Sequence, residues 1–263
     1  MAQPTLEPPR GRNSRLDGPP DAPVVILSNS LGTNLALWDD QLPALTARFR
    51  VLRYDTRGHG GSPVIPGACS VELLARDVLG LLDARKIERA HFVGLSLGGM
   101  TGMWLGMHAA ERIDRLVLAN TAPRIGAAEL WNARIDSVRN GGMEAIADTV
   151  LERWFTAGFR ARAPQSVARI RAMLATTPPD GYAACCAAVR DADLWPGLAS
   201  IRSPTLVIAG THDAATPAAE GRKMAERIAG AYYVELDAAH ISNVEAAPRF
   251  TAEAVAFLAG GKT

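Results

Sequence analysis

The feature that most constrains the fold of this chain is a series of short apolar runs separated by segments with helical spacing. Each run has three to five residues and ends near turn-forming residues, which is typical of buried strands. Strands that alternate with helices form βα units, so the pattern predicts an α/β fold with a mostly parallel central sheet flanked by helices. The six predicted strands are 24–27, 51–54, 91–93, 116–119, 206–209 and 232–236.

Helical segments lie between these runs. Ser70 is a candidate N-cap for a helix with one apolar stripe, and residues 97–108 predict a buried helix in which glycines allow close packing on a sheet. Two more helices are predicted at 217–228 and 244–258. Residues 1–22, rich in Pro, Gly and Arg, predict an irregular or weakly stranded entry.

The middle of the chain has a different character. Residues 125–196 contain no convincing strand, but they carry amphipathic segments with several large aromatic side chains, whose simplest role is to form a core of their own. We therefore expect a helical cap at 125–196, inserted over a core formed by residues 1–124 and 197–263.

Charge and cysteine content exclude several classes of protein. Lys plus Arg total 28 and Asp plus Glu total 27, so no charge excess favours nucleic acid or an anionic membrane as a partner. No apolar run approaches the roughly 18 residues that span a bilayer, and the proline-rich N-terminus has no secretory signal pattern. Three cysteines, two of them adjacent, do not make a disulfide scaffold, and no metal-ligand spacing is present. These features predict a cytoplasmic protein.

Residues 94–98 match the G-x-S-x-G pattern, between a predicted strand and a predicted helix. This is the context of a nucleophile elbow, in which the serine lies on a sharp, strained turn that lifts its hydroxyl clear of the sheet. Gly94 and Gly98 fit because side chains there would collide. The turn predicts Ser96 as a nucleophile and leaves the Leu97 N–H free at a helix N-terminus to stabilise an oxyanion.

A serine nucleophile needs a base and a carboxylate that orients the base. His240 follows the last predicted strand and Asp213 follows the preceding one, so both lie at the same sheet edge as Ser96. The order Ser96, Asp213, His240 is that of α/β-hydrolases. His91 lies at the opposite edge and His108 lies too far along the helix after Ser96, so both are more typical of structural positions. The rival acids Asp191, Asp193 and Asp237 are more typical of surface or capping positions.

The second oxyanion donor is expected in the loop after the first long strand, at 29–32. The Leu31 N–H is the natural candidate, with Ser30 next, and a plain turn is the alternative. Residues 55–62 lack the Lys-Ser/Thr ending of a phosphate-binding loop and predict a structural turn.

These residues resemble a known family. D-x-R-G-x-G-x-S and G-x-S-x-G are shared by many α/β-hydrolases, whereas SNSLGT, GYAACC and DAAHISN are similar to the 3-oxoadipate enol-lactonases (β-ketoadipate enol-lactone hydrolases). The resemblance covers residues 27–243. This sequence differs from the family in its proline-rich N-terminus and in Leu97, where methionine is often seen. Neither difference changes a residue of the predicted triad.

The resemblance implies an α/β-hydrolase fold and a Ser96–Asp213–His240 triad. It also implies opening of 3-oxoadipate enol-lactone to 3-oxoadipate through an acyl-enzyme, without a cofactor, in the β-ketoadipate pathway of aromatic-compound catabolism. The lactone carries a carboxylate, which needs a cation or strong donors in the pocket. The cap has as many acids as arginines and therefore no net charge that would attract this carboxylate. Recognition of the carboxylate must then depend on one well-placed residue.

The predicted substrate-binding residues are Ser30, Trp131 and Arg134, because Arg134 lies one helical turn from Trp131. The expected partner is a small-molecule lactone, with a monomer or homodimer as the assembly. Two alternatives stay open: a cofactor-free esterase or perhydrolase on the same triad, and a non-catalytic ligand receptor.

Overall fold

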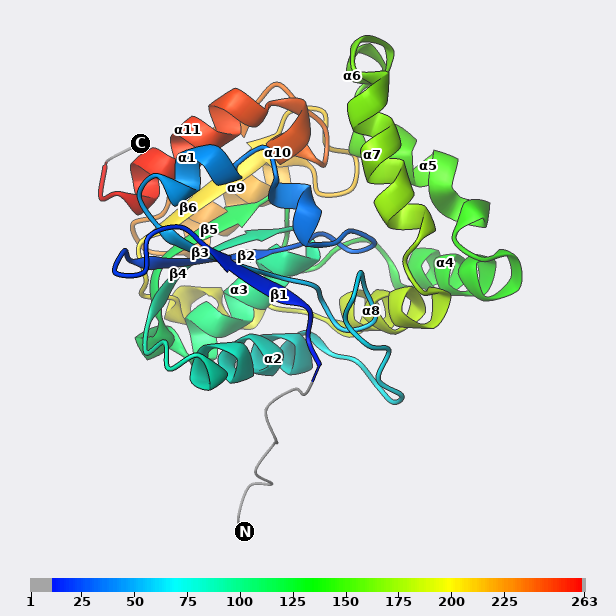
Figure 1. Ribbon diagram of the computed structural model, residues 1–263. Helices are drawn as coiled ribbons and strands as arrows, with labels where there is room; N and C mark the ends of the chain where they lie inside the picture. Colours follow the sequence, from blue (N-terminus) through cyan, green and yellow to red (C-terminus); the bar gives the residue numbers. More distant parts are fainter. Residues whose placement is uncertain (1–10, 262–263) are drawn as a thin grey trace.

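The fold is built on one seven-stranded sheet with the strand order β1-β3-β2-β4-β5-β6-β7 (Figure 1). The computed structural model describes residues 11–261. All neighbouring strands pair in parallel except β1, which runs antiparallel to β3 at one edge. The mostly parallel α/β sheet predicted from the sequence is confirmed. Its strands are β1 Ser14–Asp17, β2 Val24–Ser28, β3 Arg50–Tyr54, β4 Ala90–Leu95, β5 Ile113–Ala119, β6 Thr205–Gly210 and β7 Tyr232–Leu236.

All six predicted strands are present, and most are one to three residues longer than their apolar runs. The extra residues, such as Arg50 in β3 and Asp114 in β5, are polar or stand at strand ends, where hydrophobicity carries little signal. The added edge strand β1 is polar and half-buried, and pairs Ser14 with Tyr54. Its weak apolar pattern follows from its place at the edge, with only one neighbouring strand.

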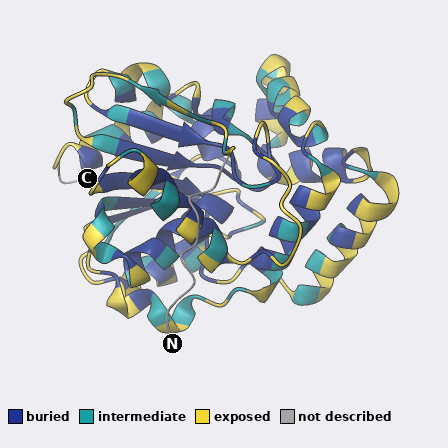
Figure 2. Ribbon diagram, turned by 60° about the horizontal axis from the view of Figure 1, so that its bottom comes forward, coloured by how far each residue is buried: buried dark blue, intermediate teal, exposed yellow. Residues whose placement is uncertain are grey.

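Helices cover both faces of the sheet (Figure 1). α1 (Leu42–Thr46) and α11 (Ala247–Leu258) pack together, α2 (Val71–Ala84) packs on α3 (Leu97–His108), and α9 (Ala218–Arg227) covers β6 and β7. Ser70 caps α2 as predicted, because its hydroxyl accepts the Leu73 N–H at 3.1 Å. The dark blue strands in Figure 2 show that the core follows the sheet.

One predicted helix was wrong. The segment 244–258 forms two helices, α10 (Ser242–Glu245) and α11, separated by Ala246 in a non-helical conformation. Pro248 explains the break, because its ring would collide with the carbonyl of Val244 in a continuous helix, whereas proline fits the first turn of a new one.

Five helices follow one another between β5 and β6: α4 (Ala128–Gly141), α5 (Glu144–Trp154), α6 (Ala157–Arg162), α7 (Pro164–Ala175) and α8 (Pro179–Asp191). Every residue from 125 to 196 is described, and none of them lies in a strand. Figure 1 shows α4 to α7 standing beside the sheet and α8 beneath them, nearer to the core. The exact division into core and cap stays a prediction: its boundary at 196/197 falls inside the 3₁₀ helix Trp195–Ser200, and residues 1–10 and 262–263 lie outside the described residues.

The cap meets the core at a pair of glycines. A Cβ on Gly58 would lie 2.5 Å from the Cα of Gly181, and a Cβ on Gly181 would lie 2.2 Å from the carbonyl oxygen of Gly58. Gly58 also has a φ of +68°, which disfavours any side chain. The backbone of α8 therefore lies directly against the loop that follows β3. Among residues 11–261, no helix is long and apolar enough to cross a membrane.

Candidate active site

The turn between β4 and α3 has the strained geometry of a nucleophile elbow. Ser96 has φ 57° and ψ −114°, a conformation that a non-glycine residue rarely adopts. A Cβ on Gly94 would lie 2.2 Å from the carbonyl oxygen of Gly98, and a Cβ on Gly98 would lie 2.2 Å from that of Ser28. Both glycines are therefore required by close backbone contacts that hold the turn.

Replacing Gly98 with alanine is expected to lower kcat/KM about 100-fold, because the new methyl group must push the elbow away from β2. Steady-state kinetics on the purified variant measure the loss, and circular dichroism shows whether the fold is retained. Gly158→Ala is the control, since a Cβ there has its nearest neighbour at 3.6 Å, on the flexible Arg162 side chain. A Gly98→Ala variant with wild-type kinetics would contradict the close contact with Ser28.

The loops after β6 and β7 bring an acid and a base together. Asp213 follows β6 and His240 follows β7, and the Nδ1 atom of His240 lies 2.8 Å from Oδ2 of Asp213. The Asp213 side chain is fully buried and that of His240 is 4% exposed. The other oxygen, Oδ1, accepts the N–H groups of Ala215 and Thr216 at 2.8 and 2.9 Å. This network orients one carboxylate oxygen towards the imidazole.

The surroundings of Asp213 keep it ionised. Burial alone would raise its pKa, but the nearby charge of His240 and the hydrogen bonds from His240 and Thr216 outweigh burial and hold the pKa of Asp213 below its ordinary value. The Thr216 hydroxyl donates to Oδ2 at 2.6 Å. An ionised Asp213 can stabilise an imidazolium at His240.

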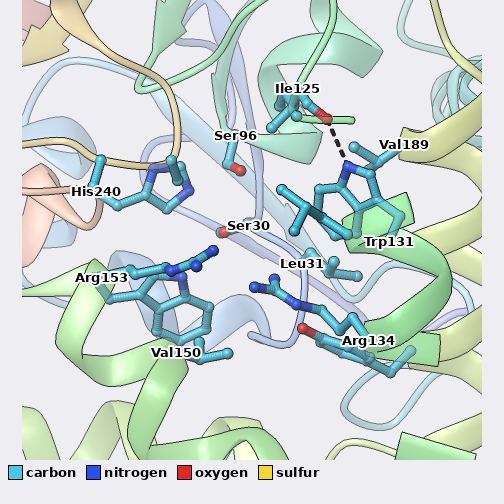
Figure 3. A pocket seen from close by; sticks show the side chains of 16 residues that line it. Ser30, Leu31, Ser96, Ile125, Trp131, Arg134, Val150, Arg153, Val189 and His240 are labelled. Atoms are coloured by element: carbon cyan, nitrogen blue, oxygen red, sulfur yellow. Dashed lines mark hydrogen bonds between the residues drawn. The ribbon is translucent and has the colours of Figure 1, made fainter. Parts of the chain in front are cut away.

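Ser96 and His240 line the same pocket, and Figure 3 shows the imidazole ring turned towards the serine hydroxyl. The hydrogen bonds found within residues 11–261 include the His240–Asp213 pair but none between Ser96 and His240. The catalytic role of the three residues stays a prediction, to which the shared pocket and the buried acid–base pair give support.

The loop after β2 is tied to the elbow by backbone and side-chain hydrogen bonds. The carbonyl of Asn29 accepts the Gly98 N–H at 3.1 Å, and the Asn29 amide donates to the carbonyl of Tyr54 at 2.8 Å. Within the described residues, the N–H groups of Leu31 and Leu97 donate to no protein acceptor. This leaves both N–H groups available, and their role as oxyanion donors stays a prediction.

The pocket has an empty volume of about 810 Å³, part of it open to solvent, and its walls come from both core and cap. Ser30 and Leu31 form the core side, and Trp131 and Arg134 of α4 lie on the cap side, as Figure 3 shows. The indole N–H of Trp131 donates to the Ile125 carbonyl at 2.6 Å, and the Arg134 guanidinium lies 5.0 Å from the centre of the Trp131 ring.

A scan against protein-family models matches residues 23–247 to the alpha/beta hydrolase fold family. The chain belongs to the α/β-hydrolase family. This hydrolase is 44% identical to 3-oxoadipate enol-lactonase 2 of Acinetobacter baylyi, over 87% of its own length and 85% of the relative's. It is 40% identical to 3-oxoadipate enol-lactonase 1 of the same organism, over 90% of its length and 88% of the relative's.

A solved structure of the enol-lactonase from Burkholderia xenovorans LB400 superimposes on the hydrolase with a TM-score of 0.93 at 52% identity. The match covers 94% of this chain and 96% of that one. The resemblance to enol-lactonases that SNSLGT, GYAACC and DAAHISN indicate is thereby confirmed.

The rival acids of the hydrolase have other partners. Asp237 is exposed and lies 2.7 Å from Nε2 of His212, and Asp191 pairs with its neighbour Arg190. Asp193 accepts the backbone N–H of Trp195 at 3.1 Å, as a capping acid does. The three cysteines are free thiols.

Sequence reasoning missed two residues of the site. Asn120 follows β5 in a left-handed conformation (φ 44°), and its amide donates to Oδ2 of Asp213 at 3.0 Å and to the Ala239 carbonyl at 3.1 Å. Its position directly after a predicted strand, at the edge that holds Ser96, was the signal. Arg153 of α5 also lines the pocket. It is one of eight cap arginines with no distinguishing spacing, so only the packing of the cap identifies it.

Proposed function

We propose that this hydrolase opens 3-oxoadipate enol-lactone to 3-oxoadipate, with Ser96 as nucleophile, His240 as general base and acid, and Asp213 as the residue that orients His240. The observation that carries the proposal is one pocket that combines Ser96 and His240 with two arginines from the cap. Relatives named 3-oxoadipate enol-lactonases, at 44% and 40% identity, support this substrate.

In the first half of the proposed reaction, the hydroxyl of Ser96 attacks the ring carbonyl while His240 accepts its proton. The negative charge develops on the former carbonyl oxygen, within reach of the N–H groups of Leu31 and Leu97, and one such donor contributes about 3 kcal/mol to the transition state. The ring C–O bond then breaks and the enol oxygen leaves. His240 gives the proton that it took from Ser96 to the leaving group, and the resulting enol tautomerises to the ketone, which makes ring opening effectively irreversible.

In the second half, the acyl group remains as an ester on Ser96. His240 removes a proton from a water molecule, whose oxygen attacks the ester carbonyl. The ester bond to Ser96 breaks, the serine oxygen regains its proton from His240, and the acyl group leaves as a carboxylate. The product therefore carries one more carboxylate than the lactone, and the steps need no cofactor.

The cap supplies a cation for the carboxylate of the substrate. Arg160, Arg171 and Arg190 each pair with an acid, whereas Arg134 and Arg153 form no ion pair within residues 11–261. Figure 3 shows both guanidinium groups turned towards the cavity. An arginine can bind a carboxylate through two parallel hydrogen bonds, which supports a role for Arg134 in substrate recognition.

Arg134→Met is expected to raise the KM for the enol-lactone about 10- to 100-fold, the range for loss of a hydrogen bond to a charged group. Methionine retains an apolar stem against Trp131, so kcat should change less. Arg139→Met, on the same helix but outside the pocket, is the matched control. An unchanged KM in the Arg134 variant would remove this residue from substrate recognition.

The direct test of the function is to add purified protein to the enol-lactone, follow the loss of its ultraviolet absorbance, and identify 3-oxoadipate as the product. Faster turnover of simple aryl esters than of the lactone would favour an esterase or perhydrolase instead. Tight binding of a ligand without turnover would favour a receptor.

A role in the β-ketoadipate pathway and a cytoplasmic location follow from the same proposal. The enzyme would act as a monomer or homodimer on a small molecule, with no nucleic acid or membrane partner. Size-exclusion chromatography with light scattering measures the assembly.

A further inference from the structure

The loop that carries His240 is attached to the cap through one buried carboxylate, Glu245. This residue ends α10 and is 8% exposed. Its Oε2 accepts the N–H of Ala239 at 3.0 Å, directly before His240. The hydroxyl of Thr156 donates to Oε1, and the Thr156 N–H lies 3.3 Å from both oxygens. Thr156 is the N-cap residue of α6, so the Glu245–Thr156 contact joins the core to the cap.

A second hydrogen bond joins the same two regions on the other side of His240. The N–H of Ile241 donates to the carbonyl of Trp154 at 3.1 Å. The backbone N–H groups before and after His240 are thus both fixed by contacts with residues 154–156, one directly and one through Glu245. Trp154 and Arg153 also line the pocket, so the segment that holds the histidine loop is part of the substrate-binding wall.

We propose that Glu245 is a positioning residue that couples the placement of the cap to the placement of the His240 imidazole. This inference rests on the proposed catalytic roles of Ser96 and His240. A shift of the cap at Thr156 is transmitted through one carboxylate to the residue next to the base, and an error of about 1 Å at a catalytic group can cost about 100-fold in rate. Glu245 itself acts only through the loop and does not touch the substrate.

The donor set explains why a carboxylate is needed at this position. The N–H of Ala239, the N–H of Thr156 and the hydroxyl of Thr156 all donate to Glu245, and the two backbone N–H groups can only donate. A glutamine of the same shape offers one acceptor oxygen, and its NH₂ group would face the backbone N–H of Ala239 or of Thr156, neither of which can accept. Glu245→Gln therefore breaks at least one side of the link, with little change in volume.

The test compares variants on both sides of the contact. Glu245→Gln changes the core side, Thr156→Val removes the hydroxyl on the cap side, and Thr156→Ser retains that hydroxyl as the conservative rescue. Thr205→Val is the control, because it removes a buried hydroxyl that donates to the Ser203 carbonyl at the start of β6, at the opposite sheet edge. The measurements are the second-order rate of Ser96 labelling by a fluorophosphonate probe, kcat and KM for the lactone, and the melting temperature.

We expect Glu245→Gln to slow labelling and lower kcat about 10- to 100-fold while KM changes less, because the histidine loop loses its fixed position. Thr156→Val should slow labelling about 3- to 10-fold although it does not touch that loop, and Thr156→Ser should restore the rate. The double variant should lose little more than Glu245→Gln alone, since both changes break one link. Thr205→Val should lower the melting temperature without slowing the labelling.

Wild-type labelling in Thr156→Val, or additive effects in the double variant, would overturn the coupling. If Glu245→Gln does not fold, Thr156→Asp decides the question, because aspartate still accepts the Phe159 N–H as the N-cap of α6 but has no hydroxyl to donate to Glu245. Slow labelling in Thr156→Asp supports the coupling, and wild-type labelling overturns it. A wild-type enzyme that reacts with the probe but not with the lactone would refute the proposed substrate while this coupling is still measured. A wild-type enzyme that does not react with the probe would refute the nucleophile, and the coupling with it.

Discussion

Replacing Ser96 with alanine should reduce kcat for the enol-lactone about 10⁶-fold, the loss found when the nucleophile of a serine hydrolase is removed. No other hydroxyl can take its place at the elbow, because Ser96 alone occupies the strained turn between β4 and α3. Alanine differs from serine only by the missing side-chain oxygen, so it can adopt the same backbone conformation and the fold should persist. Rapid quench or spectrophotometric assays at high enzyme concentration measure the residual rate.

Binding of the lactone to the Ser96→Ala variant is the control, because it shows whether the pocket is still intact when turnover is lost. The Ser96→Ala variant retains Arg134, Trp131 and the free N–H groups of Leu31 and Leu97, so it should still bind the lactone. Calorimetry with the variant and intact lactone tests this. Residual turnover close to the wild-type rate would mean that the chemistry does not pass through Ser96.

Asp213→Asn is the second change with a large expected effect, a loss of about 10⁴-fold in kcat. An asparagine can present its NH₂ group to Nδ1 of His240, which places the ring proton on the nitrogen that must accept the proton of Ser96. The exposed Asp237 offers the control, because Asp237→Asn alters only a pair with His212. If Asp237→Asn abolished turnover and Asp213→Asn did not, the assignment of the acid would be reversed.

Asp213 also links activity to stability in acid. Since the folded state holds the pKa of this carboxyl below its ordinary value, its contribution to the free energy of unfolding is present above the unfolded pKa and is lost as the pH falls through the folded pKa. The stability difference between the wild type and Asp213→Asn should therefore be largest near neutral pH and shrink in strong acid. Urea unfolding curves at a series of pH values measure it.

Most of the core could be predicted because buried parallel strands are continuous apolar runs that follow from local sequence. The elbow could be predicted as well, since the G-x-S-x-G pattern lies between a predicted strand and a predicted helix and the contact of Gly94 with Gly98 is local. The contact of Gly98 with Ser28 is long-range. Ser96, Asp213 and His240 each follow a predicted strand, so the sequence alone predicts that all three lie at one sheet edge.

The rest depends on packing that no local pattern encodes. Arg153 enters the pocket only because α5 lies over it, and the link from Glu245 to Thr156 joins residues that are 89 positions apart. The break at Ala246 was missed because the apolar spacing of 244–258 continues across it, although Pro248 was the local signal. The residues that the cap contributes to the site could not be predicted, because long-range contacts determine their positions.

The close approach of Gly58 and Gly181 has a consequence for how this scaffold can be modified. Since a methyl group at either position would collide with the facing backbone, α8 cannot be replaced by a helix with a side chain at position 181 unless the loop after β3 moves. Helix α4 contributes Trp131 and Arg134 and has no such glycine contact with the core loop. A library of variants that seeks new substrates is therefore best directed at pocket-lining positions of α4, with the sequence of α8 left unchanged.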